Sequence, residues 1–95
     1  MKKYESIIIV NPNIKEEEIE ELIENIKKII IDNKGTFLKV EKLGKKKLAY
    51  EIQKHKEGHY IKFEFEVNPE VICEIERMYR IKDIIIKFIN VKFED

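Results

Sequence analysis

The sequence contains few of the residues on which covalent or phosphate chemistry usually depends. Cys73 is its only cysteine, so it can form no intramolecular disulfide and no C-x-x-C metal or redox motif. A cysteine-poor chain fits a reducing compartment. We interpret Cys73 as a small, semi-buried hydrophobic residue on a helix. With only three glycines, the chain has no glycine-rich loop to hold a phosphate.

Long apolar runs are also absent. No stretch approaches the ~20 apolar residues of a membrane helix, and no small-residue cleavage site follows the short run from Ile7 to Val10. We therefore expect a cytoplasmic protein without a membrane partner. The 19 basic and 19 acidic residues cancel, so the net charge does not point to nucleic acid.

What is present indicates one small globular unit. Of the 95 residues, 43% are apolar and 40% are charged. This length predicts a single domain, residues 1–95, with one core and no deep internal cleft.

The sequence shows no group of residues that is typical of a catalytic or metal site. His55 and His59 lie in or beside a predicted turn, with no third ligand and no nearby nucleophile. The carboxylates gather on a solvated helix face instead of in a pocket. We predict no enzyme activity, no metal, no cofactor and no small-molecule substrate.

Hydrophobic periodicity predicts six elements. They are a strand over 3–10, a helix over 13–33, a bent strand over 37–43 and 48–52 with a bulge at Gly44, a strand over 59–67, a helix opened by Asn68-Pro69, and a strand over 84–93. The order βαββαβ predicts the α+β, ferredoxin-like fold, a four-stranded antiparallel sheet with two helices on one face.

Local signals refine these boundaries. Asn13 suits a helix N-cap with Glu16 as its capping-box partner, and Gly35 is the expected stop of that helix. Leu38 and Val40 are expected to share one half-buried face of their strand. Residues 53–58 are expected to form a polar turn.

The first and last strands are apolar on both sides, as in Ile7 to Val10 and Ile84 to Ile86. A sheet covered on one face should alternate apolar and polar residues. In the ferredoxin-like order these two strands are neighbours, so their surplus apolar side chains would form one patch on the open face. Such patches mark interaction sites. The alternative is that abundant isoleucine spills onto the surface.

Charge is unevenly distributed despite the neutral total. The segment 39–62 has eight lysines against three acids, whereas the first helix is acidic. Lysines give sequence-independent affinity for phosphates, although a solvated hairpin would have the same composition. Tyr60 and Phe63 partly match an RNA-recognition motif, but its glycines and first-strand aromatic are missing. We expect lysine and arginine side chains to contact the backbone of any bound RNA.

Several segments together resemble the bacterial small-subunit (30S) ribosomal protein family six, S-six. They are the start MKKYE, residues 10–13 (VNPN), residues 39–50 (KVEKLGKKKLAY) and residues 79–83 (YRIKD). The resemblance covers nearly the whole chain in order, and residues 43–50 are its most specific part. Glu51 departs from the family, which usually has proline after Leu-Ala-Tyr, so the path of that strand end stays open.

The resemblance implies a structural constituent of the small ribosomal subunit in the cytoplasm. It implies binding to the central domain of small-subunit ribosomal RNA together with ribosomal protein S-eighteen. The RNA-binding residues it implies are Lys2, Lys3 and Tyr4, then Arg80 and Lys92. The lysine run at the bulge, independently of the resemblance, adds Lys46 and Lys47 as candidates. The protein partner would contact Ile7, Ile9 and Tyr60 on the open face.

Two other functions remain as alternatives. One is a stand-alone regulatory or ligand-binding domain that forms a homodimer through its open sheet face. The other is a small hydrolase of the acylphosphatase kind, which would need an N-terminal arginine loop that this sequence does not have.

Overall fold

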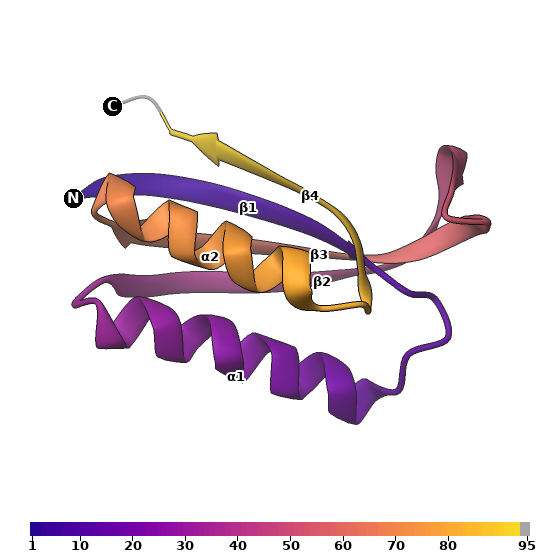
Figure 1. The fold of residues 1–95 in the computed structure, drawn as a ribbon, viewed down its shortest axis with the longest axis horizontal. Coiled ribbons are helices and arrows are strands. Elements are labelled where there is room, and N and C mark those ends of the chain that lie inside the picture. The colour runs from indigo at the N-terminus through magenta and orange to yellow at the C-terminus, as the bar shows by residue number, and fades with distance from the viewer. Residues whose placement is uncertain (94–95) are drawn as a thin grey trace.

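A computed structural model describes residues 1–93 and shows four strands and two helices in the predicted order (Figure 1). They are β1 (Lys2–Val10), α1 (Glu16–Asp32), β2 (Thr36–Ile52), β3 (His55–Val67), α2 (Pro69–Ile81) and β4 (Ile85–Lys92). The sheet order is β2-β3-β1-β4, and every pair is antiparallel. Both helices cover the same face of the sheet. The ferredoxin-like prediction is confirmed.

The core lies between that face and the two helices. Ile61, Phe63, Phe65 and Val67 of β3 are all fully buried, as their alternation predicts, and the intervening polar residues face the other side. Each buried side chain of this size stabilises the fold by roughly 1.5–3 kcal/mol. Each helix contributes a buried stripe at helical spacing. The stripe consists of Ile19, Leu22, Ile23, Ile26 and Ile30 in α1, and of Val71, Ile75 and Tyr79 in α2.

The predicted start of the first helix was wrong. α1 begins at Glu16, with Lys15 in the N-cap position and no side-chain cap hydrogen bond. The Asn13 backbone N–H instead donates to the Asn11 side-chain oxygen at 2.9 Å. This local turn leads the chain out of β1, and it ends before the helix starts.

Gly35 is not the left-handed residue that ends α1. Asn33 is the C-cap, and Lys34 takes the positive φ of 63°. Glycine is required at position 35 for space, because a Cβ there would lie 2.6 Å from the Glu66 carbonyl oxygen and 2.6 Å from Val67 Cγ1.

The long strand β2 has three register shifts against β3, and two of them lie in its first half. The predicted bulge at Gly44 is confirmed by a register shift and by a φ of +86°. A second shift between Phe37 and Lys39 puts Phe37 and Val40 against the core and leaves Leu38 exposed. The prediction that Leu38 and Val40 share a buried face was therefore wrong.

The turn between β2 and β3 is shorter than predicted. Only Gln53 and Lys54 form it, both with positive φ (48° and 68°), and β3 begins at His55. A two-residue turn with positive φ at both positions matches the right-handed twist of the strands that it joins. The joined end of β2 and β3 bends away from the helices, toward the other face of the sheet (Figure 1).

Candidate functional site

The helix-free face of the sheet has an apolar strip along β1 and its two neighbours. Ile7 pairs with Ile89 of β4, and Ile9 pairs with Lys87 on one side and Tyr60 of β3 on the other. Directly opposed residues of antiparallel strands point to the same face. The structure thus brings together Ile7, Ile9 and Tyr60, the three residues predicted for a protein partner.

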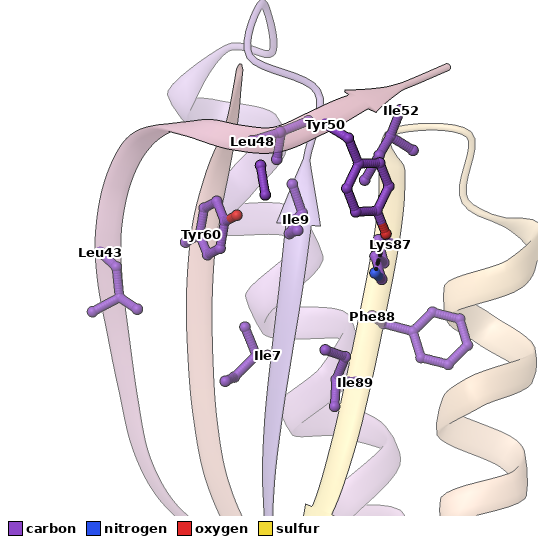
Figure 2. A pocket seen from close by; sticks show the side chains of 11 residues that line it. Ile7, Ile9, Leu43, Leu48, Tyr50, Ile52, Tyr60, Lys87, Phe88 and Ile89 are labelled. Atoms are coloured by element: carbon purple, nitrogen blue, oxygen red, sulfur yellow. Dashed lines mark hydrogen bonds between the residues drawn. The ribbon is translucent and has the colours of Figure 1, made fainter. Parts of the chain in front are cut away.

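A hollow of about 280 Å³ lies over this strip. Its floor is formed by residues of β1, β3 and β4, which are Ile7, Ile9, Tyr60, Lys87, Phe88 and Ile89. The remaining lining residues come from β2: Leu43 lies beside the sheet, and Leu48, Ala49, Tyr50 and Ile52 form the roof. Figure 2 shows β2 crossing over β3 and β1 toward β4, so that Tyr50 and Ile52 lie above the floor.

This roof explains why Ile9 is only 8% exposed although no helix covers it. A Cβ at Gly58 would lie 2.4 Å from Ile9 Cγ2, so the glycine also makes room for the isoleucine. Ile89, outside the roof, is 48% exposed. The surplus apolar residues of the sheet are therefore divided between a covered end and an open end. The alternation of Leu48, Tyr50 and Ile52 was the signal in the sequence for a second apolar surface that could cover them.

The charged groups around the hollow are cationic. Lys87 Nζ donates to the Tyr50 hydroxyl at 3.0 Å and lies 5.4 Å from the centre of its ring (Figure 2). This hydrogen bond raises the pKa of Lys87. Lys46 Nζ lies 5.8 Å from the ring centre of Tyr60. Within the described part of the chain, no carboxylate lines the hollow.

The predicted RNA-binding residues fall in separate places. Lys2, Lys3 and Lys92 lie at one end of the sheet, where Tyr4 pairs with Lys92. Lys46 and Lys47 lie on the hairpin at the other end. Val10 marks the hairpin end of β1, because it pairs with His59 of β3. It is seven positions along the strand from Lys3, or roughly 23 Å at a rise of ~3.3 Å per residue.

Arg80 lies apart from both lysine groups, on the last turn of α2. Its guanidinium is 5.7 Å from the ring centre of Phe88 and 3.5 Å from the Glu76 carboxylate. The basic residues do not form one continuous patch.

Two aromatic residues singled out in the sequence lie in the core. Tyr4 is 8% exposed, and its ring packs 6.2 Å from that of Phe65. Phe63 is fully buried against the helices, so its ring is closed to a stacking base. Tyr60, which is half-buried on the helix-free face, is the aromatic residue of that partial motif that remains accessible.

Other predicted features carry no site. Cys73 is exposed, so its semi-buried assignment was wrong. Across residues 1–93, no three potential metal-ligating side chains gather. None of the helices in that range has the length and apolar character needed to cross a bilayer.

Comparison with known proteins identifies the family. Residues 3–92 match the family model of ribosomal protein S6. The chain is 38% identical to small ribosomal subunit protein bS6 of Caldanaerobacter subterraneus over 95 residues, which is all of both chains. It is 45% identical to bS6 of Clostridium perfringens over 94 residues, or 99% of each. It spans 66% of the length of the Helicobacter pylori relative, with 42% identity.

A solved structure agrees with the sequence comparison. The crystal structure of 30S ribosomal protein S6 from Thermotoga maritima superposes with a TM-score of 0.89 at 41% identity. The match covers 97% of this chain and 87% of that one. With matching sequence, fold and strand order, the chain belongs to the ribosomal protein S6 family, whose curated relatives are proteins of the small ribosomal subunit.

Proposed function

We propose that this chain is a structural constituent of the cytoplasmic small ribosomal subunit, which acts as a single domain and has no catalytic activity. In that role it binds the central domain of small-subunit ribosomal RNA together with ribosomal protein S-eighteen. Family membership supports the assignment to the subunit. The observation that supports binding of a protein partner is the apolar hollow on the helix-free face.

The protein partner docks on that face. Ile7, Ile9 and Tyr60 form its floor, and the exposed Ile89 extends it toward the open end of the sheet. Apolar surface of this kind is removed from water on association and supplies the favourable free energy.

The RNA is bound by the exposed cations. Lys2, Lys3 and Lys92 form one group, and the hairpin lysines Lys46 and Lys47 form another. Arg80 lies apart from both, on the last turn of α2. Two separated groups suit an RNA backbone that passes the protein at more than one point. Tyr4 is assigned to the same contact as the first group, although its ring contributes to the core.

Filter binding of central-domain RNA tests this proposal. The expected result is tight binding only when S-eighteen is present, with an affinity that falls as salt rises from 50 to 200 mM. RNA binding that is equally tight without S-eighteen would contradict the cooperative assembly.

Light scattering coupled to size exclusion tests the competing homodimer. We expect the free chain to elute as a monomer and to form a one-to-one complex with S-eighteen. A stable dimer that does not exchange with S-eighteen would favour the homodimer instead.

A further inference from the structure

The roof of the hollow is held to β4 by one polar contact, the 3.0 Å hydrogen bond from Lys87 Nζ to the Tyr50 hydroxyl. We propose that the hollow is the anchor site for one apolar side chain of the protein partner. In the complex, Lys87 leaves Tyr50 and donates to a carboxylate or carbonyl oxygen beside that anchor. This inference rests on the proposed function, because it specifies the chemistry of the same docking face.

The size of the hollow suits one large side chain as its occupant. Its volume of about 280 Å³ is below the roughly 300–1,000 Å³ of pockets for drug-sized ligands. Protein interfaces concentrate their binding energy in a few apolar or aromatic anchors that fill pockets of this kind. Ile7, Ile9 and Ile89 on the floor, with Leu48 and Ala49 on the roof, offer contact on two sides.

Charge complementarity indicates which group of the partner lies next to the anchor. Lys87 lines the hollow and Lys46 packs on Tyr60, whereas the lining residues include no carboxylate. An oxygen acceptor on the partner would satisfy Lys87, and a cation there would be repelled. Hydrogen bonds in which one partner is charged are roughly twice as strong as neutral ones.

The roof includes a part of β2 that is not paired in register with β3. Its pairing with β3 is interrupted between Lys47 and Ile52, so the intervening segment, which includes Ala49 and Tyr50, lies outside the regular register. Tyr50 is 62% exposed. Moving its ring to admit an anchor breaks one exposed hydrogen bond and leaves the sheet intact.

Three variants of the full chain separate the parts of this proposal. Ala49→Phe fills the hollow from its exposed roof, Lys87→Met removes the ammonium and keeps the stem, and Tyr50→Phe removes only the competing hydroxyl. Ile81→Ala, at an exposed residue of α2, is the matched control. Each is titrated calorimetrically with purified S-eighteen at fixed salt, and its thermal unfolding is recorded in parallel.

The expected changes in affinity differ in direction among the three variants. Ala49→Phe and Lys87→Met should each weaken binding by about tenfold, the size of a lost anchor or charged hydrogen bond. Tyr50→Phe should bind at least as tightly as the unmodified chain, because Lys87 no longer has to leave a partner. The control should stay within about twofold, and the unfolding temperature of Lys87→Met should be almost unchanged.

The outcomes distinguish failure of the anchor site from failure of the proposed function. If the unmodified chain does not bind S-eighteen, the proposed function fails. If it binds and both Ala49→Phe and Lys87→Met bind within twofold of it, the anchor site is wrong. If Tyr50→Phe loses as much affinity as Lys87→Met, the exchange of Lys87 between Tyr50 and the partner is wrong. Should Ala49→Phe fail to fold, Lys87→Met alone decides.

Discussion

The hydroxyl groups of Ser6 and Tyr79 lie 2.7 Å apart in the interior of the protein, joined by a hydrogen bond between β1 and α2. Ser6 is fully buried, and Tyr79 is 1% exposed. Burial raises the pKa of Tyr79 well above its usual value, so the phenol stays neutral and satisfies the serine. This single polar pair links two elements that apolar packing alone would hold with less specific orientation.

Removing one hydroxyl of this pair should cost more than removing both. Tyr79→Phe leaves the Ser6 hydroxyl without its partner in a dry site, which should lower the free energy of unfolding by about 1–3 kcal/mol. The double variant Tyr79→Phe with Ser6→Ala should recover part of that loss. Urea unfolding of the two single variants and the double variant measures the coupling, and purely additive losses would contradict it.

Gly35 and Gly44 should respond to alanine for different reasons. At Gly35 a Cβ meets the Glu66 carbonyl oxygen, a backbone atom that cannot move cheaply, so Gly35→Ala should cost about 1–3 kcal/mol through overpacking. At Gly44 the added Cβ meets nothing within 4 Å, but the φ of +86° makes alanine strained by roughly 1–2 kcal/mol. Asparagine, which tolerates this region better, separates them: it should partly rescue position 44 and worsen position 35.

Lys42 should give a small contribution to stability that disappears in acid. Its ammonium donates to Glu16 at 2.5 Å and also contacts Glu20, which ties the start of α1 to β2. The hydrogen bond from Lys42 lowers the pKa of Glu16 below its ordinary value of 4.5. A depressed carboxyl pKa stabilises the fold above the unfolded value, and the effect is lost as pH falls through the folded one.

The matching experiment compares the native chain with Lys42→Met between pH 7 and pH 2. The difference in unfolding temperature should be small at pH 7, because all three side chains are exposed, and should shrink below about pH 4.5. Added salt at neutral pH should also reduce it. A difference that grows on acidification would mean that Lys42 acts through packing.

The repeating patterns in the sequence were enough to predict the architecture. Alternation placed Ile61, Phe63 and Phe65 in the core, and the spacing of Leu22 and Ile26 identified the buried side of α1. Such patterns work because each strand or helix must bury one face, whatever the details of its neighbours. Pairing of the first and last strands followed from the predicted fold, and it is confirmed by a register in which Ile7 lies opposite Ile89.

The errors come from contacts that depend on the whole chain. Leu38 was misplaced because a register shift beside Phe37 is set by the partner strand. Asn13 is not the N-cap because its backbone N–H donates to the Asn11 side chain in a turn that ends before the helix starts. The roof over Ile9 depends on how far β2 bends beyond Gly44, which no local pattern specifies. The candidate partner residues were predicted from sequence, whereas the hollow that gives them a shape was not.

The lysines at the start of β1 provide the sharpest test of the RNA contact. Both are exposed at the same end of the sheet as Lys92, and Lys3 also lies 5.1 Å from the ring centre of Phe93. If each neutralises one phosphate, replacing both with alanine removes two released counterions. The slope of log affinity against log salt should then fall by roughly 1.4–1.8.

The matched control replaces Lys28 and Lys34, which are exposed near the end of α1, and should leave the slope unchanged. The binding reactions contain S-eighteen throughout, so that a lost protein contact lowers affinity at every salt concentration without altering the slope. An unchanged slope for the variant at positions 2 and 3 would exclude these lysines from the phosphate contact.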